Sequence, residues 1–404
     1  MASSKKITLA VGEVIEVEIE KVAHGGHFIA RYESAVIFVR HAIPGEKCRI
    51  EITSVGSSFN RADVVEVLEA SSDRVSAPCQ YSNRTGCGGC DFQHVSQPRQ
   101  LKLKADVITE QFSRIAKIDM HVEVESVGES LGWRTRVTST TDHKGQLGFI
   151  GARSHKIIPV SNCLVATQEV GFQELVSRKW KGDMRVEIAA SNTGQRSISL
   201  VAIRSETKSR LSEGPAVLHE DVLGKTLQVS NDSFWQGHKS APTILSTVVQ
   251  EFAEVSPGDH VLDLYGGVGL FTAALVDAVQ ENGVITLIEG SKSATGDATK
   301  NFLSNPNVKI INGDVAKHLP RITAANVVVL DPPRDGAGKL VINEIARLSP
   351  RKTVYVACDP AALARDTRYF LDLGYSLVKL RAFDLFPMTH HIECVALFEP
   401  AKVS

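Results

Sequence analysis

The chain has 404 residues, of which 43% are hydrophobic and 23% are charged. These fractions are ordinary for globular proteins, and they exclude a fibrous or a wholly disordered chain. At about 100–200 residues per domain, the length predicts two to four domains. The 45 basic and 46 acidic residues give a net charge of −1. A general polyanion binder is strongly basic, so any nucleic-acid surface on this chain must be local.

The sequence lacks the features of a membrane or secreted protein. No apolar run approaches the ~18–20 residues that a spanning helix needs, and the N-terminal residues lack the apolar core of a secretory signal. Seven cysteines are present, and three of them lie between positions 79 and 90. In a long cytosolic chain, such a group indicates a metal or cluster site rather than a disulfide framework. Because the sequence has neither a spanning apolar run nor a secretory signal, we expect a cytoplasmic location.

Residues 1–68 predict a small β-barrel. Residues 15–20 alternate strictly between apolar and acidic, and Gly25-Gly26 marks a turn. Further short strands are expected at 34–39, 47–52 and 62–68, and several closely spaced strands are typical of a small barrel. The segment has eight basic and nine acidic residues, so its composition does not make it a basic clamp.

Residues 69–225 predict a central domain that contains the cysteine group, one helix and mostly strands. The helix is expected over 99–118, where apolar residues recur at helical spacing, and strands are expected over 132–225. Between positions 133 and 156 the basic residues are Arg134, Arg136, Lys144, Arg153 and Lys156, and the single acid is Asp142. This stretch is either a solvated sheet face or a surface that meets the phosphates of RNA.

Residues 226–404 predict an α/β domain. Apolar strands at 260–264, 284–288, 308–311, 326–330 and 353–357 alternate with helical stretches. This alternation is typical of a parallel sheet with helices on both faces, a Rossmann-like architecture. The fold class is therefore multi-domain α/β with an N-terminal small β-barrel.

The segment from Asp263 to Gly269 follows a buried strand and opens a helix. A dinucleotide site would require Gly-x-Gly-x-x-Gly, whereas this loop reads Asp-x-x-x-Gly-x-Gly. An acid at the strand end repels pyrophosphate and favours a cationic ligand, so S-adenosylmethionine fits better than NAD. Glu289, at the end of the second strand, can accept the ribose hydroxyls, and Asp314 lies where the adenine is expected.

Two further strand ends carry chemical groups. Asp331-Pro-Pro-Arg334 follows one strand, and the prolines stiffen a loop at the edge where ligands bind. Enzymes that methylate amino groups of bases usually place an aromatic residue after such prolines, and Arg334 argues against that chemistry. Cys358 ends the next strand, and Glu393 lies near the C-terminus. A buried structural cysteine and a surface glutamate are the ordinary alternatives.

Together, a thiol and a carboxylate beside an S-adenosylmethionine site suggest methylation of a pyrimidine at C5. A thiolate that adds to C6 makes C5 nucleophilic, and a base must then remove the C5 proton. Cys358 is the expected nucleophile, although its ordinary pKa of about 8.5 would have to be lowered, and Glu393 is the expected base.

With these motifs, the sequence resembles the uracil-C5 RNA methyltransferases, which form 5-methyluridine in tRNA and 23S rRNA. The resemblance extends over nearly the whole chain and includes Ser233-Phe-Trp-Gln236, the loop of residues 263–269, Asp331-Pro-Pro-Arg334 and residues 384–393. It implies that residues 1–68 are a TRAM domain, which binds RNA. It also implies that S-adenosylmethionine contacts Gln236, Tyr265, Glu289, Asp314 and Asp331, and that Cys358 and Glu393 take the roles given above.

The cysteine group also resembles the family pattern. Many members bind a [4Fe-4S] cluster through a Cys, a Cys-Gly-Gly-Cys and a later Cys, which correspond here to Cys79, Cys87, Cys90 and Cys163. Structural zinc uses the same number of ligands, and the spacing alone does not separate the two. The resemblance favours the iron–sulfur cluster, in a structural role.

The sequence departs from the family pattern at four places. Gly266 stands where many members have Cys, Asp359 where Asn is common, and His238 where Asn is frequent. Seven residues separate Cys79 from Cys87, where five are common. Asp359 adds a negative charge beside Cys358 that raises the thiol pKa unless the carboxylate is solvated or paired.

Three other functions remain open from the sequence. A cytosine-C5 RNA methyltransferase typically has a second cysteine where Arg334 stands. An RNA-binding or folding protein with secondary catalysis would rely on the barrel and the basic stretch, and a redox sensor would rely on a cluster that cycles. The expected partner is RNA, either 23S rRNA or tRNA. No membrane and no protein partner is implied, and a monomer is expected.

Overall fold

The computed structural model describes residues 9–152, 154–203 and 209–402. The chain forms two compact units. Unit 1 comprises Met1–Val107, Gly148–Val160 and Phe386–His391, and unit 2 comprises Ile108–Leu147, Ser161–Leu385 and Ile392–Ser404. Both units are discontinuous, because two later segments of the chain return to unit 1.

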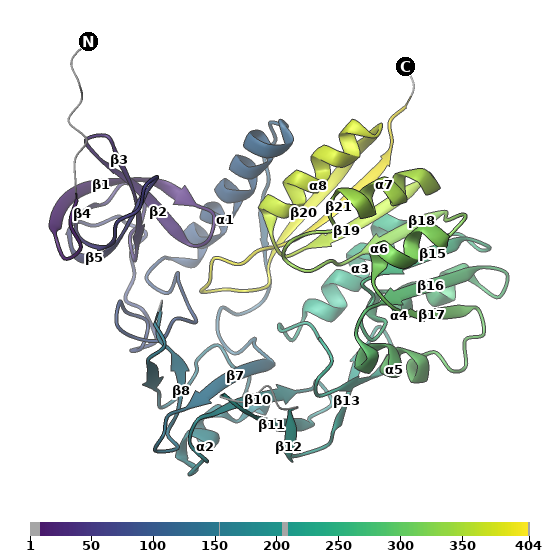
Figure 1. Ribbon diagram of the computed structural model, residues 1–404, viewed down its shortest axis with the longest axis horizontal. Helices are drawn as coiled ribbons and strands as arrows, with labels where there is room; N and C mark the ends of the chain where they lie inside the picture. The colour runs from purple at the N-terminus through teal and green to yellow at the C-terminus, as the bar shows by residue number, and fades with distance from the viewer. Residues whose placement is uncertain (1–8, 153, 204–208, 403–404) are drawn as a thin grey trace. The chain divides into compact units, whose positions relative to one another are not determined.

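The predicted N-terminal barrel is confirmed in unit 1. Five strands close in the order β1-β2-β3-β5-β4, with bounds β1 (Val14–Ala23), β2 (His27–Tyr32), β3 (Ala35–Arg40), β4 (Lys47–Ser54) and β5 (Asn60–Glu69) (Figure 1). Alternate residues of β1 point into the barrel, so Ile15, Val17 and Ile19 are buried and the glutamates between them lie outside. Arg49 contacts Glu16 at 3.0 Å and Glu66 at 2.7 Å on the outer surface. The charges of the barrel therefore pair in part with one another.

Unit 1 also contains most of one helix, a hairpin and a loop from late in the chain. Helix α1 (Gln97–Gln111) confirms the predicted helix, although the helix proper ends earlier and continues as a π-helical turn at Phe112–Ala116 in unit 2. A hairpin forms from β8 (Leu147–Ile150) and β9 (Ile157–Pro159). Phe386–His391 forms a loop that also belongs to this unit.

Unit 2 contains the predicted parallel sheet. Its eight strands run in the order β17-β16-β15-β18-β19-β21-β20-β6. The bounds are β6 (Val124–Ser126), β15 (His260–Leu264), β16 (Val284–Glu289), β17 (Val308–Asn312), β18 (Val327–Leu330), β19 (Lys352–Ala357), β20 (Tyr375–Asp384) and β21 (Glu393–Pro400). The strands from β17 to β19 are parallel, whereas β21 runs antiparallel to both of its neighbours. The central strands are buried and consist almost wholly of apolar residues.

Helices cover this sheet in two groups. Their bounds are α3 (Ala241–Ala253), α4 (Leu270–Val279), α5 (Lys292–Asn301), α6 (Val315–His318), α7 (Gly338–Leu348) and α8 (Pro360–Asp372), with a 3₁₀ turn at Leu319–Arg321. Helix α3 packs on α4, while α7 packs on both α6 and α8 (Figure 1). Most of these helices follow the carboxyl end of a strand, so the connecting loops gather at one edge of the sheet.

A smaller antiparallel sheet also lies in unit 2. Strands β7 (Arg136–Thr141), β10 (Met184–Ala190), β11 (Arg196–Ala202) and β12 (Arg210–Glu213) pair in the order β12-β11-β10-β7. The short helices Gln168–Val170 and α2 (Phe172–Ser177) precede β10, and β13 (Val217–Val222) forms a hairpin with β14 (Lys225–Ser230). In the part of the chain that the structure describes, no helix combines the length and apolar character that crossing a membrane requires.

Candidate active site

The loop after β15 has a backbone shape that depends on glycine. Tyr265, Gly267 and Gly269 have positive φ angles of 61°, 56° and 96°. A Cβ atom at Gly269 would lie 2.3 Å from the ring of Phe302, so only glycine fits where α4 begins. The chain therefore passes tightly from the carboxyl end of β15 into the helix, at the edge where sheets of this type bind ligands.

The predicted acids at the next two strand ends lie at the same edge. The carboxylate of Glu289 accepts hydrogen bonds from the N–H of Gly267 at 3.1 Å and of Ser291 at 2.6 Å. Asp314 is exposed and caps α6, where it accepts the N–H of Lys317 at 3.1 Å. Glu289 therefore joins the end of β16 to the loop after β15. Contacts of both acids with a cofactor remain a prediction.

Asp263 lies beneath the loop and is completely buried. Its Oδ2 accepts the N–H of Thr272 at 2.9 Å and the hydroxyl of Thr272 at 2.7 Å. Its Oδ1 has no hydrogen-bond partner among the residues the structure describes. Burial and, to a smaller extent, the charge of Glu289 raise the pKa of this carboxyl to about 6. Asp263 thus fixes the first turn of α4 and leaves one buried acceptor atom for a cationic ligand.

Gln236 and Asp331 meet although 95 residues separate them. The Gln236 Nε2 donates to Asp331 Oδ2 at 3.2 Å, and Gln236 is 7% exposed. Burial and the charge of Asp263 raise the pKa of Asp331 to about 7, against the opposing effect of the Gln236 hydrogen bond. Two of the residues predicted to bind S-adenosylmethionine are therefore in direct contact.

Cys358 and Glu393 meet through the register of two antiparallel strands. Ala357, the last residue of β19, pairs with Cys394 on β21. Cys358 follows Ala357, and Glu393 precedes Cys394, so the next residues in the register are the predicted nucleophile and the predicted base. Glu393 is 3% exposed, whereas Cys358 is half-buried.

The charges around Cys358 favour its neutral form. Burial, together with the carboxylates of Glu393, Asp331 and Asp359, raises the pKa of the thiol to about 12. The guanidinium of Arg334 opposes this rise. Burial, and then the charge of Asp331, raise the pKa of Glu393 well above its ordinary value. In the free enzyme, these effects therefore favour the neutral forms of both the Cys358 thiol and the Glu393 carboxyl.

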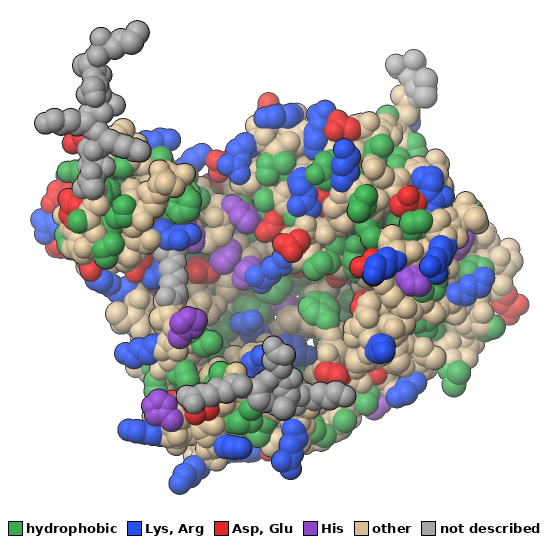
Figure 2. Space-filling view, in the orientation of Figure 1, with side chains coloured by type: hydrophobic (Ala, Val, Ile, Leu, Met, Phe, Trp, Pro, Cys, Tyr) green, Lys and Arg blue, Asp and Glu red, His purple; other side chains and the backbone are tan. Residues whose placement is uncertain are grey.

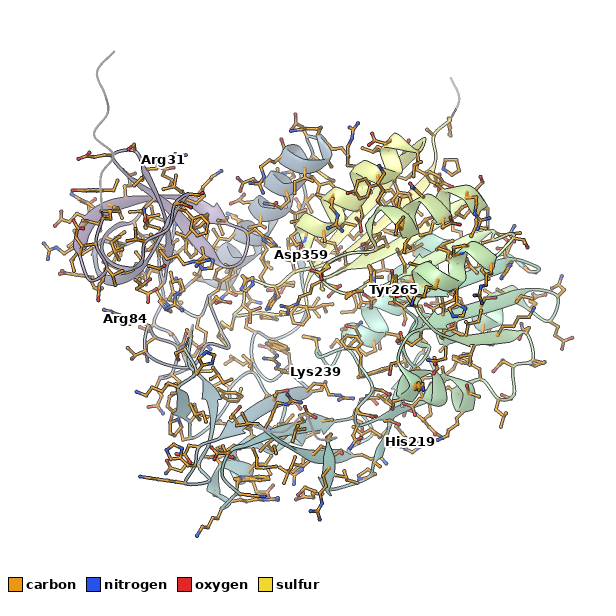
Figure 3. The ribbon with its side chains drawn as sticks, in the orientation of Figure 1. Arg31, Arg84, His219, Lys239, Tyr265 and Asp359 are labelled. Atoms are coloured by element: carbon orange, nitrogen blue, oxygen red, sulfur yellow. The ribbon has the colours of Figure 1, made fainter. Side chains whose placement is uncertain are left out.

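The charge effect expected of Asp359 is present but is the smallest of these contributions. Asp359 caps α8, where its Oδ1 accepts the N–H groups of Ala361 at 3.0 Å and Ala362 at 2.8 Å. Figure 3 labels Asp359 and Tyr265, which follow the strand ends of β19 and β15. Because the carboxylate is paired with helix N–H groups, its charge is partly compensated.

The other two single-residue departures from the family pattern also have structural reasons. A Cβ atom at Gly266 would lie 2.6 Å from Leu287 Cγ, so a larger residue there requires Leu287 to move. His238 stacks on Trp133 with ring centroids 5.6 Å apart, and its Nδ1 accepts the N–H of Ser240 at 3.0 Å. Burial lowers the pKa of His238 to about 4, so the ring is neutral and supports the turn that carries Gln236.

Sequence reasoning missed two residues of this region. Asp366 on α8 is fully buried and accepts hydrogen bonds from the Tyr355 hydroxyl at 2.8 Å and the Ala337 N–H at 2.8 Å. It anchors the loop that follows Asp331, and its only sequence signal was an acid on the apolar face of a helix. Phe234, two residues before Gln236, is 70% exposed, which is unusual for a phenylalanine.

The four predicted metal ligands are divided between the two units. Cys79, Cys87 and Cys90 lie in unit 1, whereas Cys163 lies in unit 2. Within the described ranges, no three His, Cys, Asp or Glu side chains are grouped as metal ligands. The Cys-Gly-Gly-Cys turn is nevertheless compact, because the N–H of Gly89 donates to Cys87 Sγ at 3.4 Å. The cluster remains a prediction.

The basic stretch is only partly available to RNA. Arg136 is bound to the carboxylate of Glu220 at 2.9 Å and to a backbone carbonyl, whereas Lys144 and Lys156 are exposed. Arg153 lies outside the described residues. On the face shown in Figure 2, Lys and Arg side chains lie among Asp and Glu. This pattern agrees with the net charge near zero.

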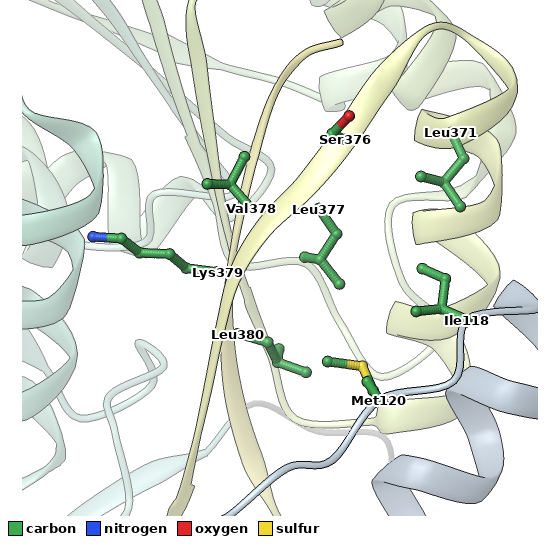
Figure 4. A pocket seen from close by; sticks show the side chains of 8 residues that line it. All are labelled: Ile118, Met120, Leu371, Ser376, Leu377, Val378, Lys379 and Leu380. Carbon is green, nitrogen blue, oxygen red and sulfur yellow. The ribbon is translucent and has the colours of Figure 1, made fainter. Parts of the chain in front are cut away.

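A surface cavity of about 370 Å³ lies elsewhere in unit 2. Its walls are mainly apolar and come from β20, the end of α8 and the segment after the π-helical turn (Figure 4). None of the predicted catalytic or cofactor residues lines it. The candidate active site is therefore the set of strand-end residues around Asp331, Cys358 and Glu393.

Three family models match the chain. The TRAM domain model matches residues 9–65, and the tRNA (Uracil-5-)-methyltransferase model matches residues 318–401. The model of Protein-L-isoaspartate(D-aspartate) O-methyltransferase matches residues 225–329. The last two matches together cover the large sheet from β15 to β21. The TRAM match covers most of the barrel and confirms the domain predicted there.

Relatives match over the whole length. An uncharacterized RNA methyltransferase of Streptomyces avermitilis is 42% identical, and the alignment covers 97% of this chain and 99% of that one. A second, from Streptomyces coelicolor, is 41% identical over 97% of this chain and 94% of that one. Among solved structures, the tRNA (uracil-54, C5)-methyltransferase of Pyrococcus abyssi, in complex with S-adenosyl-L-homocysteine, matches with a TM-score of 0.73. It is 20% identical and aligns over 95% of this chain and 100% of that one, which shows a shared fold.

These matches agree with the residues at the strand ends. The uracil-5 model covers the segment that contains Cys358 and Glu393, and the full-length relatives are RNA methyltransferases. The chain therefore belongs to the family of S-adenosylmethionine-dependent RNA (uracil-C5-)methyltransferases and is an enzyme of that class.

Proposed function

We propose that the enzyme methylates C5 of one uridine in a structured RNA, either 23S rRNA or tRNA, through a covalent bond between Cys358 and C6 of the base. The observation that carries the proposal is the strand register that brings Cys358 next to Glu393 at the edge of the sheet. The reaction requires a nucleophile and a base on one uracil ring, and these two side chains supply both.

In the proposed reaction, the Cys358 thiol releases its proton to solvent, the resulting thiolate forms a bond to C6, and the electrons of the C5–C6 double bond shift toward C5 and O4. When bound by the residues predicted to contact it, S-adenosylmethionine would supply the methyl group for C5, and the electron pair of the broken S–CH3 bond would stay on its sulfur. The Glu393 carboxylate accepts the C5 proton, the double bond forms again, and the thiolate leaves. Because burial raises the pKa of Glu393, its carboxyl must first release its own proton to solvent, and its ionised form is then a stronger base toward the carbon-bound proton.

The residues predicted to bind S-adenosylmethionine are Gln236, Tyr265, Glu289, Asp314 and Asp331. Tyr265, Asp314 and Asp331 follow the ends of β15, β17 and β18. Glu289 is the last residue of β16, and Gln236 contacts Asp331. The buried and unpaired Oδ1 of Asp263 nearby suits a ligand with positive charge. Asp331 is the acid that interacts electrostatically with both Cys358 and Glu393, so it links the cofactor residues to the catalytic pair.

The exposed ring of Phe234 suits the RNA substrate. Its position two residues before Gln236 places an aromatic surface at the cofactor motif. Proteins that bind unpaired bases stack them on such rings, and a base whose C5 and C6 react must leave its own stack. The TRAM barrel and the exposed lysines of the basic stretch are the proposed contacts for the rest of the RNA. We place the enzyme in the cytoplasm and expect it to act as a monomer.

We further propose that Cys79, Cys87, Cys90 and Cys163 bind a [4Fe-4S] cluster with a structural role. The compact Cys87-Gly-Gly-Cys90 turn supports this, since a Cβ atom at Gly88 would lie 3.0 Å from the backbone of Ala152. Iron and sulfide analysis of anaerobically purified protein tests the cluster. A content of one zinc per chain, with no iron, would show that these cysteines bind zinc instead of an iron–sulfur cluster.

Nucleoside mass spectrometry tests the reaction. The purified enzyme is incubated with labelled S-adenosylmethionine and, in separate reactions, with unmodified tRNA and 23S rRNA transcripts. We expect labelled 5-methyluridine in one pool, no product from Cys358→Ala, and a trapped RNA–protein adduct from Glu393→Gln. Labelled 5-methylcytidine would show that the target is cytosine. Turnover by Cys358→Ala would rule out the covalent route.

A further inference from the structure

The loop Phe386–His391 connects two strands of the active-site sheet. It follows β20, which ends at Asp384, and it leads to Glu393, the first residue of β21. Both strands belong to unit 2, whereas the loop itself belongs to unit 1. The residues that hold the loop in place are therefore sought within unit 1.

Helix α1 presents two buried polar side chains to this loop. Gln100 and Lys104 are each 1% exposed, and their spacing of four residues places them on one face of the helix. The Lys104 Nζ donates to the carbonyl of Phe386 at 3.1 Å. Burial of an ammonium group is unfavourable unless the group forms hydrogen bonds. The bond to Phe386 therefore compensates in part for the burial of Lys104.

Gln100 binds the loop from the side of Met388. Its Oε1 accepts the N–H of Met388 at 2.9 Å, and its Nε2 donates to the carbonyls of Phe92 at 3.1 Å and Val95 at 2.9 Å. The N–H of Phe92 in turn donates to the carbonyl of Met388 at 3.0 Å. Both backbone groups of Met388 are therefore bound by α1 and by the segment that precedes it.

Met388 needs such support. Its φ angle is +67°, a left-handed conformation that residues other than glycine adopt only where the surroundings hold them. The same loop is bound again at His390, whose Nδ1 lies 2.6 Å from Asp91 Oδ2. The loop thus has one conformation imposed on it at Phe386, Met388 and His390.

We propose that Gln100 and Lys104 are positioning residues for the methyl-transfer reaction, because they fix the loop that sets the position of Glu393. The proposal rests on the base role proposed for Glu393. A general base must lie within hydrogen-bond reach of the proton that it removes, and a displacement of about 1 Å can cost roughly a hundredfold in rate. Neither side chain has a role in forming the bond between Cys358 and C6, so loss of either slows proton removal selectively.

The test compares Gln100→Leu and Lys104→Met with Glu393→Gln and with the matched control Gln111→Leu. Gln111 is the last residue of α1, is 2% exposed and accepts a hydrogen bond from Arg114 rather than from the loop. For each variant the measurements are the Tm, kcat and KM for RNA, the fraction of RNA in a covalent adduct on denaturing gels, and hydrogen exchange of the peptide covering residues 386–394.

We expect Gln100→Leu and Lys104→Met to lower kcat by about tenfold to a hundredfold, with KM for RNA within twofold. The covalent adduct should accumulate as it does in Glu393→Gln, and exchange in residues 386–394 should accelerate. Gln111→Leu should leave these quantities unchanged. Lys104→Met alone carries the test if Gln100→Leu does not fold.

Two results would overturn the proposal. One is unchanged exchange in residues 386–394 in both α1 variants, whatever their kcat. The other is accelerated exchange without adduct while Glu393→Gln does accumulate adduct, which would separate the loop from the base. If Glu393→Gln itself forms no adduct, the base role fails, and the exchange data still decide whether α1 fixes the loop.

Discussion

The neutral thiol of Cys358 has a measurable consequence, because iodoacetamide reacts with thiolates. Burial and three nearby carboxylates raise the pKa of Cys358 to about 12, whereas an unfolded cysteine has a pKa of about 8.5. The same residue can therefore be alkylated in the folded enzyme and in urea, and the two rates compared. No substrate is needed, so the result is independent of the RNA target.

The expected difference follows from these values. At pH 8, about a quarter of an unfolded cysteine is thiolate, compared with about one part in 10⁴ of a thiol with a pKa of about 12. A thiolate of higher pKa is more nucleophilic, and a Brønsted coefficient of about 0.4–0.5 recovers roughly 25- to 60-fold of this loss. We therefore expect alkylation of Cys358 to be about 40- to 100-fold slower in the folded enzyme.

The assay quantifies the peptide that contains Cys358 by mass spectrometry after timed exposure to iodoacetamide between pH 7 and 10. The folded enzyme should show a rate that rises about tenfold per pH unit over the whole range. Arg334→Met should slow the reaction further, because the charge of Arg334 lowers the thiol pKa. Arg321→Met removes an exposed arginine that does not act on Cys358 and should have no effect.

Two outcomes would contradict this reasoning. A rate that reaches a plateau below pH 8 would mean that the thiol is already ionised in the free enzyme. Folded and unfolded rates within about threefold of each other would mean that burial does not protect the neutral form. Steric shielding alone would also slow the reaction, but its pH dependence would level off near the ordinary pKa of cysteine.

Three further predictions concern stability and RNA binding. Asp331→Asn should raise the Tm of the free enzyme at pH 8 and change it much less at pH 4.5. The pKa of Asp331 is about 7 in the folded enzyme and near 3.9 when unfolded, so the ionised carboxyl destabilises the fold only as the pH rises, and equal shifts at both pH values would refute this. Gly266→Ala should lower stability by about 1–3 kcal/mol, because its Cβ would press on Leu287; an unchanged urea midpoint would show that Leu287 yields freely. Phe234→Ala should raise KM for RNA about 5- to 150-fold through lost base stacking, with an unchanged Kd for S-adenosylmethionine, and a normal KM would exclude the stacking role.

Local patterns in the sequence were sufficient to predict the strands and the residues at their carboxyl ends. The alternation over residues 15–20 predicts a half-buried strand, and β1 occupies that place. Continuous apolar runs predict the parallel strands, whose observed ends lie within a residue of those expected. Because parallel strands present their carboxyl ends at one edge, residues that follow them, such as Asp331 and Cys358, are expected near each other without knowledge of the strand order.

The pairing of the two proposed catalytic side chains, Cys358 and Glu393, could be seen only in the tertiary structure. Glu393 begins a strand that enters the sheet antiparallel, between β19 and β20. A register one residue away would turn its side chain to the opposite face, and no local pattern fixes that register. The pKa shifts depend on the same arrangement, since they arise from burial and from charges that are distant in sequence.

The sequence by itself determined the family, the order of the strands along the chain, the residues at the strand ends and the barrel, because each depends on neighbours within a few positions. The tertiary structure alone identified Gln100 and Lys104, which appear in the sequence as ordinary polar residues of an amphipathic helix. Their partners in the loop of residues 386–391 lie more than 280 residues away in the sequence. Burial of a polar side chain is decided by what packs over it, and here that covering segment is the loop that leads to Glu393.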